Sequence, residues 1–206
     1  MRSVVTSARS SKEQAVALSL HVPKSDVAAD AGAFRAAMRQ LPGGVAIITA
    51  ADRSGAGGMT VTSLVSLSVD PPSIMVAINR STSTWPLIAA SGAFGANILA
   101  ADDVDLADRF SGKGGLKGTR RFEPELWSTL STGAPILVSA LVALDCRVER
   151  IIEHHTHAIV IGRVVEVRAT NGRDALAYRN GSYVAVGDDD LQTLADACFG
   201  TAECAR

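Results

Sequence analysis

The sequence predicts a mainly β (α+β) chain in which six or seven strands form an antiparallel barrel with short helices packed around it. Two observations support this fold class: apolar runs of strand length recur along the chain, and tight turns join most of them. A third is that strands and helices do not alternate regularly, as they would in a parallel α/β sheet. With 206 residues, 47% of them hydrophobic and 20% charged, the chain can form one domain with a sizeable core.

Seven segments have the pattern of strands and lie, in chain order, at 45–51, 59–69, 73–79, 93–99, 141–153, 157–169 and 182–187. In the segment 59–69, apolar side chains occupy odd positions and polar ones even positions, which is typical of a half-buried strand. Ser63 and Leu64 interrupt that alternation and predict a bulge or a bend. The main predicted connections are turns at 52–58 and Asn171-Gly172 and a long loop at 111–135.

Three short helices are predicted among these strands, over residues 33–41, 80–92 and 101–110. The first places Phe34, Met38 and Leu41 on one face. The second begins at a cap, Ser83 or Thr84, and ends at a glycine, as helices often do. The third carries acidic residues early and an arginine late, which suits the helix dipole.

The predicted domain spans residues 31–187, with residues 1–30 as a flexible N-terminal arm and residues 188–206 as a helical tail. The net charge of −1, from 20 basic and 21 acidic side chains, argues against nucleic acid or an anionic membrane as the main partner. No apolar run is long enough to span a membrane, and the N-terminus lacks the apolar core of a secretory signal. The three scattered cysteines fit a reducing compartment, so a cytoplasmic protein is expected.

A row of hydroxyl side chains is the first candidate for chemistry, and its members are Thr60, Thr62, Ser63, Ser66 and Ser68. One interpretation is the wet face of a strand. The other is that these hydroxyls and nearby backbone N–H groups hold a polar ligand. The segment NRSTST (79–84) favours the ligand, because it leads into a helix N-terminus whose free N–H groups and dipole suit a phosphate. An ordinary N-cap is the competing explanation for Ser83 or Thr84.

The order of several motifs points to a family. These motifs are, in chain order, GGMTVTSLVSLSVDPPSIMVAINRSTSTWPLI, SGAFGANIL, LADRFSG, GAPIL, LDCRVE, THAIVIGRV and YRNGSY. Together they strongly resemble the flavin reductases with an FMN-binding split-barrel fold. These are the reductase components of two-component flavin-dependent monooxygenases, and the resemblance covers roughly residues 33–187. It implies a split-barrel homodimer that binds FMN or FAD, takes hydride from NADH or NADPH, and supplies reduced flavin to a partner monooxygenase.

The resemblance also implies which residues contact the flavin. Those expected to line it or run beside its ring are Thr60, Val61, Thr62, Ser63, Ser66, Leu67 and Ser68. Those expected at the ribityl-phosphate end are Asn79, Ser81, Ser83 and Thr84. Those expected at the pocket wall or closing over it are Asn97, Leu99, Arg109, Phe110 and Ser111. Lys113 is expected to reach the phosphate or the adenine part of FAD, and Tyr183 to touch the flavin or pack in the barrel.

The segment EHHTH (153–157) is expected to face the nicotinamide. The family usually has Gly-Asp-His here, and His157 aligns with the histidine placed beside the nicotinamide and flavin rings, which makes it the catalytic candidate. His155-Thr156 replace the Gly-Asp part, so the local turn departs from the family pattern. Glu153, His155 and His157 would share a face of a strand, but the predicted turn breaks that face, so no metal site is expected.

Other signatures are missing from the sequence. GKGGLKG (112–118) does not match the dinucleotide fingerprint G-x-G-x-x-G, and neither a P-loop nor a Ser-His-Asp set is evident. Hydride transfer from nicotinamide to flavin is done by the cofactors themselves, so these absences are compatible with a flavin reductase. Two alternatives stay open: a split-barrel protein that holds FMN as an electron carrier or store, and a structural barrel whose hydroxyl face contacts another protein.

Overall fold

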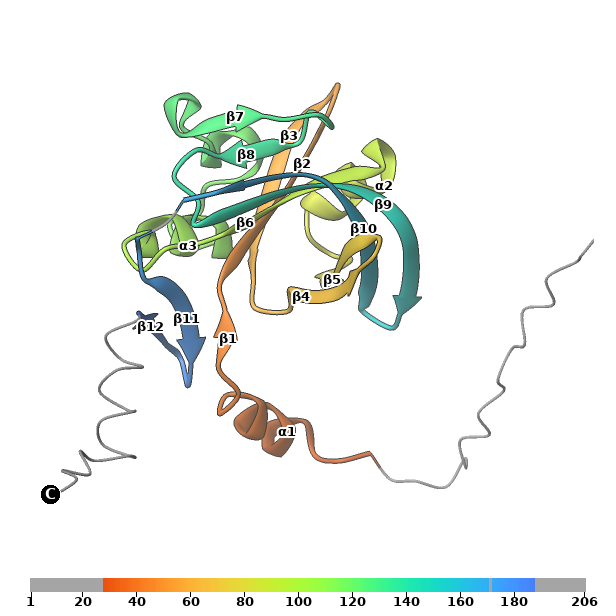
Figure 1. Ribbon diagram of the computed structural model, residues 1–206. Helices are drawn as coiled ribbons and strands as arrows, with labels where there is room; N and C mark the ends of the chain where they lie inside the picture. Colours follow the sequence, from red (N-terminus) through yellow and green to blue (C-terminus); the bar gives the residue numbers. More distant parts are fainter. Residues whose placement is uncertain (1–27, 171, 188–206) are drawn as a thin grey trace, which may run out of the picture.

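The structure is a computed structural model that describes residues 28–170 and 172–187, and Figure 1 shows a strongly curved sheet with helices beside it. The main sheet has seven strands in the spatial order β3-β2-β6-β9-β10-β5-β4, and every neighbouring pair is antiparallel. Its strands are β2 (Ala46–Asp52), β3 (Gly55–Val61), β4 (Val65–Val69), β5 (Pro72–Asn79), β6 (Ala93–Ile98), β9 (Val142–His154) and β10 (His157–Ala169). The antiparallel, mainly β architecture predicted from the sequence is confirmed.

Smaller elements surround this sheet. A three-stranded sheet contains β1 (Gly43–Gly44), β11 (Ala175–Arg179) and β12 (Ser182–Val186), and a two-stranded sheet contains β7 (Trp127–Thr129) and β8 (Pro135–Leu137). The helices are α1 (Ala31–Met38), α2 (Thr84–Ser91) and α3 (Val104–Ser111), with 3-10 turns η1 (Gly118–Arg121) and η2 (Pro124–Leu126). Within the described residues, no helix is long and apolar enough to cross a membrane.

The curvature of the main sheet follows from the way its two edge strands are connected. β3 and β4 lie at opposite edges, yet only residues 62–64 separate them in the chain. The sheet therefore has to curl until its edges come close together, which gives a barrel that backbone pairing does not close. The predicted single strand 59–69 was wrong, because the interruption at Ser63-Leu64 is the crossing between two strands. Ser63 fastens this crossing by donating a hydrogen bond to the Ala77 carbonyl oxygen at 3.0 Å.

The core lies on both faces of β2. Ile48 packs inside the barrel with Phe94 and Val160, whereas Ile47 packs outward with Phe110 and other side chains beneath α3 and β8. A strand buried on both faces needs an apolar run without alternation, which is what VAIITA (45–50) provides. The outward cluster is what places α3 against the barrel.

The other departures from the predicted elements are local. The predicted turn 52–58 was wrong, because β3 begins at Gly55 and its glycines sit inside a strand. The predicted loop 111–135 contains η1, η2 and β7, and the strand β11 was not predicted. These elements are too short for a periodic pattern, and β11 also depends on pairing with the distant strand β1.

The predicted helices are present with shifted ends. α2 ends as expected, with Gly92 in the left-handed conformation at φ 64°. α1 stops at Met38 and stands apart from the barrel in Figure 1, with Phe34 61% exposed. The proposed flexible arm, apart from residues 28–30, the helical tail 188–206 and Asn171 of the predicted turn lie outside the described residues.

Candidate functional site

Strand β3 forms one wall of three neighbouring hollows. The inner hollow, about 220 Å³, is lined by Val45, Thr60, Val61, Thr62, Ser111, Lys113, Tyr178 and Tyr183. The middle hollow, about 260 Å³, is lined by Gly58, Met59, Thr60, Thr82, Ser83, Thr84, Phe110, Ser111 and Arg121. The outer hollow, about 400 Å³, is lined by Ser54, Gly55, Ala56, Gly57, Ser83, Leu87, Lys117, Gly118, Thr119 and Arg120. Shared residues join neighbouring hollows, so the three form one continuous groove along β3.

Two glycines of β3 allow the helices to pack directly on the strand. A Cβ atom on Gly57 would lie 2.8 Å from the Leu87 side chain of α2. A Cβ atom on Gly58 would lie 2.7 Å from the buried Phe110 ring of α3. Both distances are shorter than any carbon–carbon contact allows. The N-terminus of α2 and the C-terminus of α3 are therefore held close to β3, where they form the walls of the groove.

The middle hollow contains the N-terminus of α2. The N-cap residue Ser83 makes no side-chain capping bond among the described residues, and no acidic residue occupies the first turn. The hydroxyl oxygen of Thr84 is buried and also has no hydrogen-bond partner within the described part of the chain. A helix N-terminus with unused donors and a positive dipole end is a favourable place for an anion.

Arg121 brings a cation to the same hollow. Its Nε donates to the Leu116 carbonyl oxygen at 2.8 Å, and Nη1 donates to the carbonyl oxygens of Gly58 at 2.9 Å and Phe110 at 3.2 Å. These three bonds fix the guanidinium between β3, the end of α3 and the following loop. The group keeps its full positive charge, because arginine is not deprotonated in proteins.

Two residues that line the inner hollow, Lys113 and Tyr183, share a carboxylate partner. Asp108 accepts a hydrogen bond from the Tyr183 hydroxyl at 2.9 Å and pairs with the Lys113 ammonium at 2.7 Å. The bond from Lys113 lowers the pKa of Asp108, and burial, together with Asp108, raises the pKa of Tyr183 to about 12. At neutral pH the Asp108 carboxyl is therefore anionic and the Tyr183 phenol neutral. The Tyr178 ring packs edge-on against Tyr183, 5.2 Å between centroids.

The loop before α2 is shaped by Asn79 and adjoins His157. The Asn79 side-chain oxygen accepts hydrogen bonds from the backbone N–H and the hydroxyl of Ser81, both at 2.9 Å. His157 pairs with Asn79 across β5 and β10, is exposed, and has its Nδ1 2.8 Å from the Thr156 hydroxyl oxygen. His157 therefore lies at the sheet position next to the loop that leads into the middle hollow.

The glutamate of the EHHTH segment has a structural partner. Arg80 forms an ion pair with Glu153 at 2.8 Å and also donates to the His155 carbonyl oxygen at 3.4 Å. His155 occupies the left-handed region at φ 50°, in the turn between β9 and β10. Among the described residues, no group of three histidine, cysteine, aspartate or glutamate side chains could hold a metal ion.

The structure brings part of the predicted site together. The predicted residues that line the inner or middle hollow are Thr60, Val61, Thr62, Ser83, Thr84, Phe110, Ser111, Lys113 and Tyr183. The predicted residues that do not line the three hollows are Ser63, Ser66, Leu67, Ser68, Asn79, Ser81, Asn97, Leu99, Arg109 and His157.

Several residues of the second group have local partners. Asn97 is buried, donates to the Ile47 carbonyl oxygen at 3.0 Å and accepts from the Leu137 N–H at 2.7 Å. Arg109 pairs with Glu123. Leu99 is fully buried in the cluster that contains Val45. Ser66 and Leu67 are exposed on the edge strand β4.

Sequence reasoning missed Asp108, Arg121 and the two cations of the outer hollow, Lys117 and Arg120. Asp108 stands in an ordinary amphipathic helix, and the three arginine or lysine positions stand in a loop without periodicity. The one usable signal was the density of basic residues in GKGGLKGTRR (112–121), directly after a helix expected to face the pocket.

The fold and the groove define a split β-barrel protein with an anion-compatible, nucleotide-sized site. The family model of the flavin reductase like domain matches residues 38–187. The chain is 38% identical over 153 residues to FMN reductase (NADH) RutF 2 of Rhizobium rhizogenes (strain K84 / ATCC BAA-868), covering 74% of this chain and 87% of that protein. This chain belongs to the flavin reductase family.

Solved structures of flavin reductases have the same fold. BorF, the flavin reductase component of a bacterial two-component tryptophan halogenase, superposes with a TM-score of 0.72 at 28% identity, over 77% of this chain and 99% of BorF. A flavin reductase domain protein from Arthrobacter sp. FB24 superposes with a TM-score of 0.69 at 32% identity, over 76% of this chain and 95% of that one. The family resemblance and the split-barrel fold inferred from the sequence motifs are confirmed.

Proposed function

We propose that this chain is an NAD(P)H-dependent flavin reductase that reduces FMN or FAD and supplies reduced flavin to a partner flavin-dependent monooxygenase. The observation that carries the proposal is the groove along β3, where a helix N-terminus with unused donors adjoins a hollow lined by hydroxyls and aromatic rings. Relatives named FMN reductase (NADH) and neighbours from two-component systems support the same activity.

The flavin phosphate fits the middle hollow. The N–H groups of Ser83 and Thr84 have no hydrogen-bond partner among the described residues, whereas the Trp85 N–H bonds the Thr82 carbonyl oxygen. With the Thr84 hydroxyl and the Arg121 guanidinium, they offer donors and positive charge to one small volume. A buried hydroxyl without a partner costs roughly 1–3 kcal/mol, and a phosphate oxygen would remove that cost by accepting a hydrogen bond from it. The residues present therefore fit the phosphate group of either flavin.

The flavin ring and ribityl chain fit the inner hollow. Thr60 and Thr62 offer polar atoms along β3, whereas Val45 and Tyr178 offer apolar surface. When both nucleotides are bound, hydride passes from the nicotinamide to the flavin by the chemistry of the two rings. The protein contributes orientation, with Lys113 and Tyr183 held at the wall of the inner hollow by their shared bonds to Asp108.

A homodimer explains why some expected contacts lie outside the groove of a single chain. Apolar side chains are exposed on β4 and on the β9–β10 hairpin: Val65 47%, Leu67 48%, Val69 85%, Ile151 36%, Ile152 44%, Ile159 36% and Val167 60%. An apolar, unpaired edge strand beside such a patch is typical of a surface that another chain covers. In the proposed dimer, Ser66, Leu67, Ser68 and His157 stand at or near this interface, where a second copy completes the site.

His157 is proposed to act on the nicotinamide side. It is exposed at the start of β10, beside the loop that leads to the phosphate site, and its Nδ1 contacts Thr156 while Nε2 has no partner among the described residues. His157→Ala is expected to slow flavin reduction by NADH more than it weakens flavin binding, as stopped-flow reduction and flavin titration would measure. Weakened binding with an unchanged reduction rate would instead make His157 a flavin ligand or a structural residue.

Steady-state turnover tests the proposed function. NADH or NADPH is mixed with catalytic amounts of protein and an excess of free FMN or FAD, and the nicotinamide absorbance is followed. Many turnovers per chain are expected. Tight flavin binding without nicotinamide oxidation would replace the proposal with an electron carrier, and failure to bind either flavin would contradict both.

We also propose that the enzyme works in the cytoplasm. Its proposed hydride donors are metabolites of that compartment, and Cys146 is a free buried thiol whose pKa is raised to about 12 by burial. Fractionation of cells that produce a tagged protein would test this location, and recovery in a secreted fraction would contradict it.

A further inference from the structure

The outer hollow is a part of the groove to which the proposed function gives no role. It is the largest of the three, at about 400 Å³, and meets the middle hollow at Ser83, the N-cap of α2. Along β3 the order is fixed: the inner hollow contacts Thr60 to Thr62, the middle one Gly58 to Thr60, and the outer one Gly55 to Gly57. A ligand whose phosphate sits at the α2 N-terminus can therefore continue from it into the outer hollow.

The segment that carries Lys117 and Arg120 forms one wall of the outer hollow and contacts β3 at two points. A Cβ atom on Gly55 would lie 3.1 Å from the Thr119 methyl carbon, so η1 rests directly on the start of β3. One residue after Arg120, the Arg121 guanidinium bonds the Gly58 and Phe110 carbonyl oxygens. These contacts hold the backbone of Lys117 and Arg120 over the groove rather than leaving it free in solvent.

The charge of this wall is positive. Lys117 and Arg120 are exposed, and neither side chain has an ion pair or hydrogen bond within residues 28–170 and 172–187. The closest carboxylate in sequence to the β3 side of the hollow is Asp52, whose pKa is lowered by hydrogen bonds from Ser54. Asp52 does not line the hollow, whereas Lys117 and Arg120 do, and Leu87 and Ala56 add apolar surface.

We infer that the outer hollow binds the adenosine monophosphate half of FAD, with Lys117 and Arg120 holding its phosphate. The inference rests on the proposed function, because it takes the flavin phosphate to lie at the α2 N-terminus. The second phosphate of FAD is joined to that first phosphate through one bridging oxygen, and the only continuation of the groove away from the inner hollow within the described residues is the outer one. The chain then takes both flavins and binds FAD more tightly than FMN.

The experiment compares the two flavins in one charge-reversed variant. In Lys117→Glu/Arg120→Glu, the dissociation constant for FAD is expected to rise by about tenfold or more, since two charge-assisted contacts become repulsive. The constant for FMN, which has no second phosphate, is expected to change by less than about twofold. Fluorescence titration measures both. Equal changes for FMN and FAD, or no change for either, would overturn the inference.

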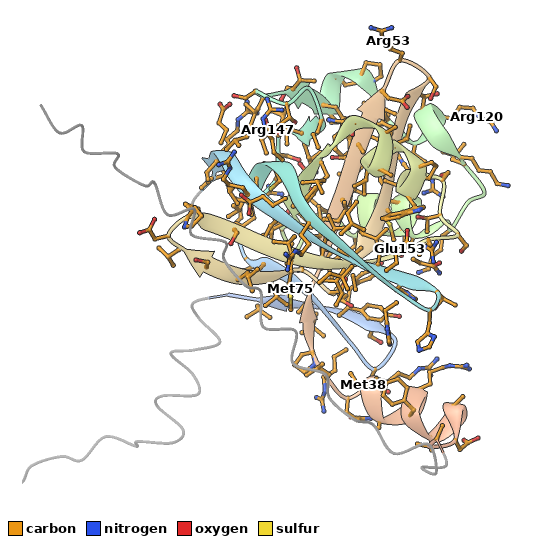
Figure 2. All side chains as sticks on the ribbon, turned by 90° about the vertical axis from the view of Figure 1, so that its right-hand side faces the viewer. Met38, Arg53, Met75, Arg120, Arg147 and Glu153 are labelled. Carbon is orange, nitrogen blue, oxygen red and sulfur yellow. The ribbon has the colours of Figure 1, made fainter. Side chains whose placement is uncertain are left out.

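A matched control separates a local contact from general electrostatics. Arg147→Glu reverses an exposed charge that lies well away from Arg120 in Figure 2 and lines none of the three hollows. It is expected to leave the ratio of the FAD and FMN constants unchanged. Because Lys117 and Arg120 have no side-chain partners in the described chain, the variant should keep its melting temperature, and Lys117→Gln/Arg120→Gln should show the same selective loss of FAD in weaker form.

The adenosine half is shared by FAD and the nicotinamide nucleotides, and a further arm distinguishes them. With FMN as acceptor, the KM for NADH in the double variant is expected to stay at the unmodified value. A rise in that KM with an unchanged FAD constant would assign the hollow to the nicotinamide nucleotide and overturn the inference. Loss of the proposed function would look different, since the unmodified protein would then reduce no flavin at all.

Discussion

Strands β3 and β4 both carry members of the hydroxyl row, but these side chains lie in different surroundings. On β3, Thr60 lies beneath α3, donates a hydrogen bond to the Ala107 carbonyl oxygen at 2.7 Å and lines two hollows. On β4, Ser68 donates only to the nearby Asp70 carbonyl oxygen at 3.2 Å, and Val69 is 85% exposed. The difference comes from their neighbours: two helices cover β3, whereas β4 is a free edge. Alternation therefore identifies a strand, and only the covering elements decide whether its hydroxyls form a site.

Substitutions on the edge strand β4 are expected to have the largest effect, a change in the oligomeric state of the protein. Val69→Asp together with Val65→Asp should convert the proposed dimer to a monomer, because charges replace apolar side chains in the centre of the proposed interface. Sedimentation velocity would measure the mass. An unmodified protein that is already monomeric would contradict the interface. A dimer that survives both charges would move the interface elsewhere.

The covered strand gives the largest expected effect on stability. Gly58→Ala places a methyl group 2.7 Å from the fully buried Phe110 ring, so α3 has to shift away from β3. The free energy of unfolding should fall by about 1–3 kcal/mol, the usual cost of overpacking a core. Urea unfolding would measure it. The matched change on the edge strand, Ser66→Ala, should cost less than about 0.5 kcal/mol, as exposed positions usually do.

A substitution in the middle hollow is expected to change the stability of the protein and its affinity for flavin in opposite directions. Thr84→Val removes a buried hydroxyl that has no partner among the described residues. The flavin-free protein should keep or gain stability, while the affinity for FMN should fall by about tenfold to a hundredfold, as one hydrogen bond to a charged group is worth. Thermal melting and flavin titration measure the two quantities. Loss of stability without loss of FMN affinity would make Thr84 a structural residue.

A substitution in the inner hollow is expected to have the smallest effect, a change in how the free energy of unfolding depends on pH in the alkaline range. The folded protein favours the neutral Tyr183 phenol, because burial and the Asp108 carboxylate raise its pKa to about 12. The stabilising contribution is therefore complete below the ordinary tyrosine pKa of about 10 and is lost as the pH rises towards about 12. Tyr183→Phe should flatten this decline in urea unfolding measured at several alkaline pH values.

The buried Cys146 thiol, whose pKa is also raised to about 12, contributes a parallel decline. The comparison is therefore made between Cys146→Ala and Cys146→Ala/Tyr183→Phe, which share the thiol change. Identical slopes in these two variants would contradict the role of Tyr183.

The part of the site that sequence could predict is the local part. The hydroxyls of β3 and the start of α2 follow from alternation and capping, so Thr60, Thr62 and Thr84 were found. Arg121 and Asp108 were not, because their partners are remote: Arg121 bonds Gly58, 63 positions away, and Asp108 bonds Tyr183, 75 positions away. The same limit explains the fold, since an antiparallel, mainly β architecture was predictable but the strand order, with β3 and β4 at opposite edges and β12 in a separate sheet, was not.

The affinity ratio of FMN to riboflavin tests the central claim most directly, because the two flavins differ only in the phosphate group. If the phosphate lies at the N-terminus of α2 with Thr84 and Arg121, the unmodified protein should bind FMN at least about tenfold more tightly than riboflavin. Thr84→Val should reduce that ratio by weakening FMN alone. Equal affinity for the two flavins, or a ratio that Thr84→Val leaves unchanged, would contradict the placement of the flavin along β3.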